Sequence, residues 1–262
     1  MSPAPRPAVR VSVCMATYRG ERWVAEQVTS VLAEIGPDDE LVVVDDASPD
    51  GTTDVLRQID DPRLRIVEQA VNGGYVRAFA TALEHARGAY LLLSDQDDVW
   101  VPGRVEVMLA ALQDHDVVAG NLATLGGPDS IHSPLGRPGW RLRASDSGHH
   151  VRNVLGVLAG ARPYFGCAMG LRREALEVAT PFPAGLRESH DLWFALYGNL
   201  AGSIAHVDDV VVLRRYHRDN ASPDRPRGVV AALRSRLLLV RCVVELRRRL
   251  RRSGARRGRP AR

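Results

Sequence analysis

The chain has 262 residues, a formal net charge of +4 at pH 7, and 45% hydrophobic and 5% aromatic residues. This composition is typical of a globular protein with an ordinary core. The length and the three scattered cysteines exclude a disulfide-stapled miniprotein. None of the cysteines has metal-ligand spacing, and an odd, scattered set favours a reducing compartment.

The first part of the chain alternates between strand-like and helix-like segments. Residues 1–8 are rich in proline, and we expect them to be disordered. Continuous apolar runs predict strands at 9–18, 39–48, 63–69 and 89–98. Apolar residues at helical spacing predict helices at 20–35, 52–59, 75–86 and 103–113. Strands that are apolar throughout, alternating with helices, predict an α/β fold with a mostly parallel sheet covered on both faces.

The second part is less regular. We expect a strand at 116–125, a long loop at 126–150, and a strand followed by a helix at 165–179. A loop entering a helix follows at 186–200, then a strand at 203–217 and a linker at 218–228. Residues 9–225 are therefore expected to form one domain, with halves at 9–115 and 116–225.

Carboxylates gather where the predicted strands end. The strand ends carry Thr17 and Tyr18, then Asp45 and Asp46, then Asp95, Asp97 and Asp98. Parallel strands present their carboxyl ends at one edge of the sheet, where ligands bind. Such a cluster is unfavourable unless it is protonated, paired with arginine or neutralised by a cation, and oxygen ligands suit Mg²⁺ or Mn²⁺. The simpler interpretation of a single aspartate, Asp50 or Asp98 for example, is a helix cap or a turn.

Glycine-rich nucleotide motifs are missing from the sequence. No G-x-G-x-x-G follows the first strand and no G-x-x-x-x-G-K-[ST] occurs, so a dinucleotide-dependent dehydrogenase or a P-loop enzyme is not expected. A nucleotide held through a metal ion fits the pattern better.

Several stretches match a known family in order. They read "VSVCMATYRGERWVAEQVTSVLAE", "DELVVVDDASPDGT" and "NGGYVRAFATALEHARGAYLLLSDQDDVWVPGRV". Over about residues 10–110 the chain resembles the family 2 glycosyltransferases, and "SDQDDVW" is similar to the rhamnosyltransferase-like branch. Further on, "FGCAMGLRREAL", "ESHDLWFAL" and "RRYHRDNAS" resemble distal motifs of that branch. The resemblance implies the GT-A fold, a Rossmann-like, mostly parallel sheet in one domain, with 9–115 as the nucleotide-sugar-binding half and 116–225 as the acceptor-binding half.

The resemblance also implies roles for individual residues. Contacts with the nucleotide sugar are expected from Thr17, Tyr18, Asp45, Asp46 and Asp95. Asp95 and Asp97 form the D-x-D motif, in which Asp97 is a ligand of Mg²⁺ or Mn²⁺ and Asp95 contacts ribose or the metal shell. His217 is expected to complete the metal or diphosphate site, although a surface histidine is the simpler interpretation.

Asp191 matches the catalytic base of the family, although "SHD" alone is also a capped helix start. Weaker candidates for contacts with the acceptor or the diphosphate are His190, Trp193, Arg215 and Asn220. The chain departs from the family pattern at Arg214, where tyrosine is common, and at His190, where glutamate is common. For Trp193 and Tyr164 there are two interpretations, stacking on an acceptor sugar and packing in the core, and core packing is the simpler one.

The favoured hypothesis is a metal-dependent, inverting glycosyltransferase that moves a sugar, rhamnose first, from a dTDP- or UDP-sugar to a glycan or lipid-linked acceptor. One alternative is a nucleotidyltransferase-like enzyme, in which Arg19 and Arg22 cradle a triphosphate. Another alternative is an inactive fold that binds phosphates or nucleic acid through its basic C-terminal segment. Under the favoured hypothesis, no specific nucleic-acid partner is expected.

The C-terminal segment is strongly basic. Residues 228–262 hold 12 arginines and one acid, Glu245. We expect a tail at 226–262, consisting of a basic amphipathic helix from Val229 and a flexible end from Arg251. Its apolar positions are Val230, Leu233, Leu237, Val240, Val244, Leu246 and Leu250. The helix either packs on the domain or contacts the anionic inner face of the membrane. With no signal peptide and no apolar run of ~18 residues, a cytoplasmic protein is expected.

Overall fold

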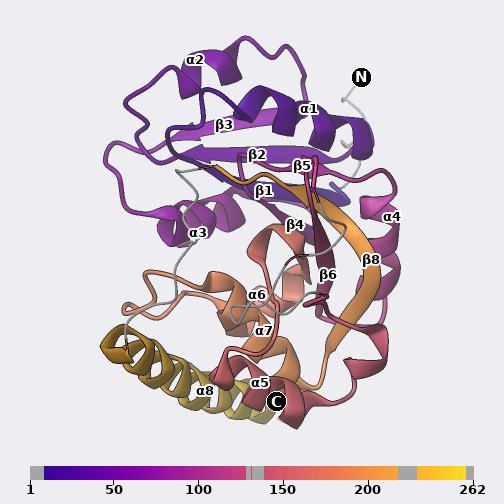
Figure 1. The fold of residues 1–262 in the computed structure, drawn as a ribbon, viewed down its shortest axis with the longest axis vertical. Coiled ribbons are helices and arrows are strands. Elements are labelled where there is room, and N and C mark those ends of the chain that lie inside the picture. The colour runs from indigo at the N-terminus through magenta and orange to yellow at the C-terminus, as the bar shows by residue number, and fades with distance from the viewer. Residues whose placement is uncertain (1–8, 128–130, 132–138, 218–228, 258–262) are drawn as a thin grey trace, which may run out of the picture.

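The computed structural model describes residues 9–127, 131, 139–217 and 229–257 (Figure 1). Within this part of the chain, strands form one sheet in the order β3-β2-β1-β4-β7-β6-β8-β5. They are β1 Val11–Thr17, β2 Glu40–Asp45, β3 Leu64–Glu68, β4 Tyr90–Ser94, β5 Val99–Trp100, β6 Val117–Thr124, β7 Met169–Arg172 and β8 Ile204–Arg214. The strands β1 to β4 are parallel, β7 runs antiparallel to β4 and β6, and β8 is parallel to β6. The predicted α/β fold with a mostly parallel sheet is confirmed.

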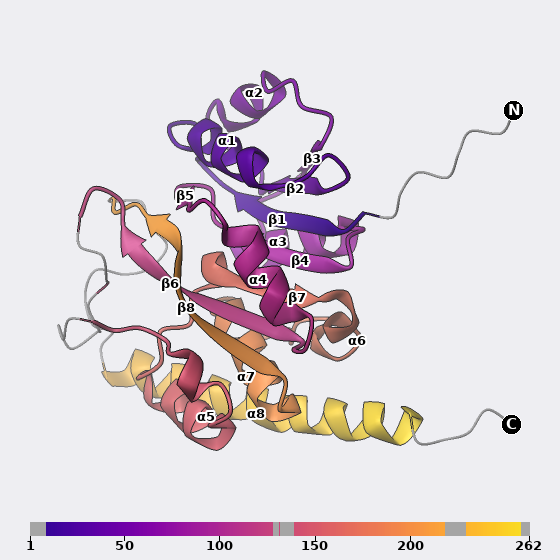
Figure 2. The same ribbon diagram turned by 90° about the vertical axis from the view of Figure 1, so that its right-hand side faces the viewer.

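Helices cover both faces of this sheet (Figures 1 and 2). They are α1 Val24–Glu34, α2 Thr52–Arg57, α3 Tyr75–His85, α4 Arg104–Leu112, α5 His150–Ala159, α6 Leu176–Ala179, α7 His190–Ala201 and α8 Val229–Arg257. Short 3₁₀ turns lie at Ala144–Asp146, Gly166–Ala168 and Arg173–Ala175. Apolar side chains of α1 and α4 pack on one face, and those of α3 and α7 pack on the other.

The continuous apolar strands are explained by this two-sided burial. In β4, Leu91 and Leu93 face the core under α3 and α7, and Leu92 faces the core under α1 and α4. All three are fully buried. Burying a leucine side chain contributes about 1.5–3 kcal/mol, so a polar residue on either face would weaken the sheet.

Three local features differ from the sequence predictions. The fourth strand ends at Ser94, and residues 95–98 leave the ladder before the short strand β5 begins. A helix, α5, occupies His150–Ala159, where none was expected, because the surrounding glycines and polar residues obscured its period. The helix α8 continues to Arg257, through the stretch predicted to be flexible.

The helix α8 is packed against the domain rather than separate from it. Its buried side chains are Leu239, Cys242, Val243 and Leu246, which join the core beside α7. Among the described residues, no helix is both long enough and apolar enough to cross a bilayer.

Candidate functional site

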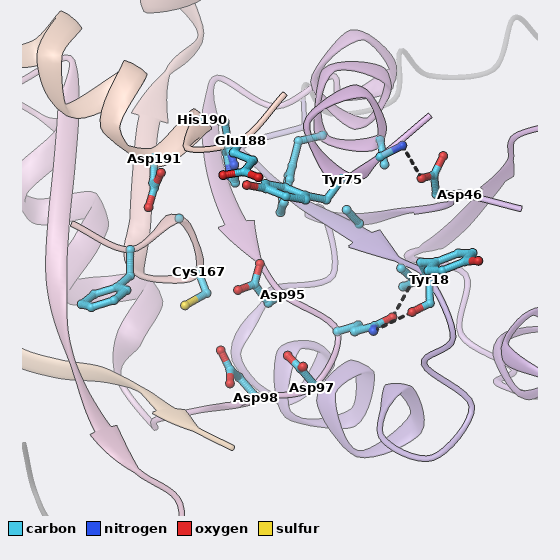
Figure 3. A pocket seen from close by; sticks show the side chains of 18 of the residues that line it. Tyr18, Asp46, Tyr75, Asp95, Asp97, Asp98, Cys167, Glu188, His190 and Asp191 are labelled. Carbon is cyan, nitrogen blue, oxygen red and sulfur yellow. Dashed lines mark hydrogen bonds between the residues drawn. The ribbon is translucent and has the colours of Figure 1, made fainter. Parts of the chain in front are cut away.

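A pocket of about 440 Å³ lies at the carboxyl ends of β1, β2 and β4 (Figure 3). Its lining residues come from four strand ends and from the starts of two helices. They are Ala16, Thr17, Tyr18, Asp46, Asn72, Gly74, Tyr75, Ala78, Phe79, Asp95, Gln96, Asp97, Asp98, Phe165, Gly166, Cys167, Glu188, Ser189, His190, Asp191 and Arg214. The structure therefore brings together the strand-end carboxylates and the "ESHD" motif of residues 188–191, which is distant from them in the sequence.

The ends of β1 and β2 are joined by a buried hydrogen-bond network. The hydroxyl of Thr17 donates to Asp45 over 3.0 Å, and Ser48 donates to the same carboxylate through its backbone N–H (2.8 Å) and its hydroxyl (2.6 Å). Asp45 does not line the pocket. Its carboxylate fixes the backbone that carries Thr17, which does line it.

Asp46 organises the loop on the other side of β2. Its two carboxylate oxygens accept the backbone N–H groups of Gly73 (2.8 Å) and Gly74 (2.7 Å). Gly74 has φ of 85°, a left-handed conformation that favours glycine, and it directly precedes α3. The "NGG" loop is therefore anchored to the strand end, and this anchoring positions the first turn of α3 at the pocket.

Tyr18 and Gln96 connect the ends of β1 and β4. The backbone N–H of Tyr18 donates to the side-chain oxygen of Gln96 (2.8 Å), and the side-chain amide of Gln96 donates to the carbonyl of Tyr18 (2.9 Å). A Cβ at position 20 would meet the side-chain amide of Gln96, so a larger residue there would displace Gln96 from this position. Tyr18 lines the pocket and is 38% exposed, and the guanidinium of Arg19 lies 5.3 Å from the centre of its ring.

An acidic cluster forms the centre of the pocket. One ligand atom from each of Asp95, Asp98 and Cys167 lies within 4.8 Å of the others. Burial and the neighbouring carboxylates of Asp98 and Asp97 raise the pKa of Asp95. Burial and the charge of Asp97 likewise raise the pKa of Asp98, and burial raises the pKa of the Cys167 thiol. The mutual repulsion of these carboxylates would be relieved by a divalent cation that accepts carboxylate oxygens.

Two arginines beside this cluster were not singled out as site residues by the sequence. Arg214 lines the pocket, with its guanidinium 5.7 Å from the ring centre of Phe165. Burial opposes its charge, but Cys167, Asp98 and Asp95 raise the pKa of Arg214. Arg104 is buried, stacks at 3.8 Å over Trp100 and donates to the carbonyl of Leu93. Arg104 follows a glycine inside a helix pattern, and nothing in the sequence marks it as buried.

Asp97 and His217 meet at the edge of the pocket. The Nε2 atom of His217 lies 2.7 Å from a carboxylate oxygen of Asp97, and its ring stacks on Trp23. Next to it, Arg215 donates from its backbone to Asp98 (3.1 Å) and from its guanidinium to Glu26 (2.6 Å). The strand β8 is thereby tied to the acidic loop. Arg215 itself does not line the pocket.

The opposite wall is the start of α7. Asp191, Glu188 and His190 lie across the pocket from Asp97 and Asp98, with Asp95 between the two groups (Figure 3). Ser189 has φ of 66° and donates its backbone N–H to the hydroxyl of Tyr75. This contact fixes the turn that presents Asp191 to the pocket.

His190 is buried in this wall. Its ring stacks on Phe79 with ring centres 4.3 Å apart, and burial lowers the pKa of His190 to about 3. Its imidazole is therefore neutral at physiological pH. Neither ring nitrogen has a hydrogen-bond partner within the described residues.

Other candidates lie elsewhere. Trp193 is fully buried and donates its indole N–H to the carbonyl of Ala179, so it packs in the core and does not line the pocket. Tyr164 is also buried, with its hydroxyl 2.8 Å from Nε2 of His206. Asn220 lies outside the described residues.

Comparison with known proteins identifies the family of the chain. The family described as "Glycosyl transferase family 2" matches residues 12–178, which is more than half of the chain. The chain belongs to glycosyltransferase family 2. The match covers the strand ends that carry Tyr18, Asp46 and Asp97, and it ends before Asp191.

Curated relatives match about two fifths of this family 2 chain. One relative is TuaG of Bacillus subtilis (strain 168), which is named as a glycosyltransferase of teichuronic acid biosynthesis. It is 38% identical over 101 residues, and this match covers 38% of this chain and 40% of that protein. WfgD of Escherichia coli is named a UDP-Glc:α-D-GlcNAc-diphosphoundecaprenol β-1,3-glucosyltransferase, and it is 28% identical over 41% of this chain and 42% of its own length. The chain thus matches about two fifths of the length of these relatives.

The fold of the family 2 chain is similar to that of TarS from S. aureus. A crystal structure of TarS residues 1–349 in complex with UDP-GlcNAc aligns with 92% of this chain and 72% of the TarS chain, with a TM-score of 0.65 and 18% identity. The similarity confirms the GT-A-like fold that was predicted.

Proposed function

We propose that this family 2 enzyme transfers a sugar from a nucleotide diphosphate sugar to a hydroxyl group of a glycan or a lipid-linked acceptor. The observation that carries the proposal is the arrangement of carboxylates in one pocket. The acidic loop 95–98 and Asp191 line opposite walls of that pocket, at the carboxyl ends of the parallel strands.

The nucleotide would lie at the ends of β1 and β2. There the exposed ring of Tyr18 offers a face on which a base can stack, with Thr17 and Asp46 beside it. Arg214 adds a positive charge near the place where a diphosphate would meet the acidic loop. We rank dTDP-rhamnose first among donors, because "SDQDDVW" resembles the rhamnosyltransferase-like branch.

The acidic cluster would hold Mg²⁺ or Mn²⁺. Asp95, Asp98 and Cys167 offer ligand atoms within 4.8 Å of one another, and Asp97 with His217 lies at the edge of the same pocket. A bound divalent cation would stabilise the charge that develops on the diphosphate leaving group. The carboxylate oxygens suit Mg²⁺ and Mn²⁺ alike, whereas burial raises the pKa of the Cys167 thiol and disfavours the thiolate.

Asp191 would act as the general base. It lies on the wall opposite Asp97 and Asp98, so it can accept the proton of an acceptor hydroxyl while the leaving group stays on the other side. Attack from that side inverts the configuration at the anomeric carbon. Glu188, on the same wall, is the next candidate for this role.

The acceptor class is proposed from a relative. The name of WfgD specifies an acceptor linked to undecaprenol through a diphosphate. A lipid-linked acceptor would place this chain at the inner face of a membrane, and the basic C-terminal segment fits peripheral contact with anionic lipids.

The two alternative functions have less support. A nucleotidyltransferase was expected to cradle a triphosphate with Arg19 and Arg22, and neither residue lines the pocket. An inactive phosphate-binding fold does not require the carboxylates that the pocket retains.

A panel of nucleotide sugars tests the proposal. The purified chain is incubated with dTDP-rhamnose, UDP-glucose, UDP-galactose and UDP-GlcNAc, with Mn²⁺, Mg²⁺ or EDTA, and release of the nucleotide diphosphate is measured. We expect turnover of dTDP-rhamnose with Mn²⁺ or Mg²⁺, reversible loss in EDTA, and loss in Asp97→Ala.

The matched control is Asp209→Ala, at an exposed aspartate of β8, which should keep wild-type turnover. Turnover of UDP-glucose or UDP-galactose but not dTDP-rhamnose would contradict the donor ranking. Full activity of Asp97→Ala in EDTA would contradict the metal site, and no turnover of any donor under any condition would contradict the transferase.

A further inference from the structure

The helix α8 has two apolar faces, and the described part of the chain covers only one of them. Leu239, Cys242, Val243 and Leu246 are buried against the domain. Four other apolar side chains are exposed: Leu233 by 64%, Leu237 by 53%, Val240 by 46% and Val244 by 63%. These four residues, which we call the outer stripe, include most of the period that the sequence analysis identified.

The outer stripe is continuous along the helix. Its members follow one another at intervals of four, three and four residues, which places them on one side of an α-helix. From Leu233 to Val244 the stripe extends over about 16 Å, at about 1.5 Å per residue. The surface helix of a globular domain carries polar side chains on its outward side, so a row of aliphatic residues there indicates a partner.

Arginines line both edges of the outer stripe. Arg234, Arg241 and Arg248 recur every seven residues and are exposed along one edge. On the other edge, Arg247 is exposed, and Arg236 is half-buried with its guanidinium beside Gly160 at the end of α5. The one acid in α8, Glu245, is engaged by Arg249 over 2.9 Å. The surface therefore combines aliphatic contact with positive charge on both sides.

We propose that the outer stripe is a docking surface for an anionic lipid bilayer, with α8 lying in the plane of the membrane interface. The aliphatic side chains would enter the boundary between head groups and acyl chains, while the arginines on both edges contact lipid phosphates. A second copy of the chain is disfavoured as the occupant, because pairing two outer stripes would bring rows of arginine against rows of arginine.

The helix that carries the outer stripe packs against a helix that lines the pocket. The helix α7 begins with His190 and Asp191 and packs along α8, which lies at one edge of the molecule (Figures 1 and 2). A bilayer beneath α8 would therefore lie on the side of the molecule that carries the proposed general base. That the membrane presents the acceptor rests on the proposed function, whereas the docking surface itself rests on α8.

Sedimentation with vesicles tests the surface. Vesicles of phosphatidylcholine alone, or with 30% phosphatidylglycerol, are mixed with the full chain at low and high salt. We expect binding to the anionic vesicles, weaker binding at high salt, and little binding to phosphatidylcholine alone. Leu233→Gln/Leu237→Gln/Val244→Gln should lower the partition coefficient by ~10-fold or more, because the aliphatic contribution is lost. Arg241→Gln/Arg248→Gln should weaken binding to anionic vesicles alone.

The matched control is Val71→Gln, at a valine that is 60% exposed in the loop between β3 and α3, and it should bind vesicles as the wild type does. Circular dichroism checks that each variant is folded, which is expected because only exposed side chains change. Equal binding by the stripe variant and the wild type would overturn the proposal. The proposal would also be overturned if the wild type forms a dimer in analytical ultracentrifugation and the stripe variant does not, because the outer stripe would then serve self-association.

Turnover of a water-soluble donor separates the two proposals. The stripe variants should retain donor turnover, since no stripe residue lines the pocket. Vesicle binding without turnover by the wild type would reject the transferase and leave the docking surface in place. Turnover without vesicle binding would reject the docking surface alone.

Discussion

Replacing Asp98 with asparagine should stabilise the ligand-free protein, because the change removes a buried charge from a cluster of like charges. Burial and the charge of Asp97 raise the pKa of Asp98 from 3.8 to about 6. An acid whose pKa is higher in the folded state carries no penalty below its unfolded pKa, and it loses stability as the pH rises through the folded pKa. Each pKa unit corresponds to about 1.4 kcal/mol, so the penalty above pH 6 is on the order of 3 kcal/mol.

Asparagine keeps the shape of the side chain and the oxygen that accepts the backbone N–H of Arg215. The variant should therefore gain stability at pH 8 and gain little near pH 4. For a chain of this length, a gain of that size corresponds to a rise in melting temperature of about 5 °C. Differential scanning calorimetry in EDTA at the two pH values measures it, with Asp209→Asn, at an exposed position, as the control.

An unchanged melting temperature at pH 8 would show that the acidic cluster is not strained in the absence of a ligand. An equal gain at both pH values would attribute the effect to packing rather than to charge. Either result would refute the electrostatic reasoning on which the proposed cation site depends.

Two further predictions concern single carboxylates. Asp191→Asn should lower kcat by roughly 10²–10⁴ and leave the Kd for the donor unchanged in calorimetric titration, because it removes the base and keeps the shape. If Asp191→Asn keeps the wild-type kcat and Glu188→Gln loses it, the general base is Glu188 instead. Burial alone would raise the pKa of Glu40, but hydrogen bonds from Arg87, Ser12 and Arg65 lower this pKa to about 2. The charge of Glu40 therefore stabilises the fold at neutral pH, and this contribution is lost as the pH falls from 4.5 toward 2. Glu40→Gln should therefore lower the free energy of unfolding by roughly 1–3 kcal/mol at pH 7 and by much less at pH 2.5, and an equal loss at both values would count against the ion pairs.

The first half of the fold followed from the sequence because its signals are local. The strands β1, β2 and β4 are mostly apolar on both faces, as in β4 with Leu91 to Leu93, and helices follow them along the chain. Parallel pairing then places the ends of β1, β2 and β4 together, which is why the strand-end aspartates could be assigned to one pocket.

Other features depend on contacts between distant segments. Asp98 was placed in the strand-end cluster, with a cap or a turn as the simpler alternative, but its burial depends on the return of β8, which also provides the backbone N–H of Arg215. The burial of Arg104 and the place of Cys167 beside Asp98 likewise depend on how β7 and β8 join the sheet. For α8, the more regular apolar period was the exposed one, because a helix with two apolar faces gives no indication of which face the domain covers.

The paired hydrogen bonds between Gln96 and the backbone of Tyr18 have a consequence for how this enzyme can diverge. Gln96 holds the main chain of residue 18 on both its donor and its acceptor side, and no part of this contact involves the phenol ring. The conformation at the end of β1 is thus independent of the side chain present there. Position 18 can therefore accept new side chains while the strand end stays in register, so the lining of the pocket can change by mutation without loss of the fold.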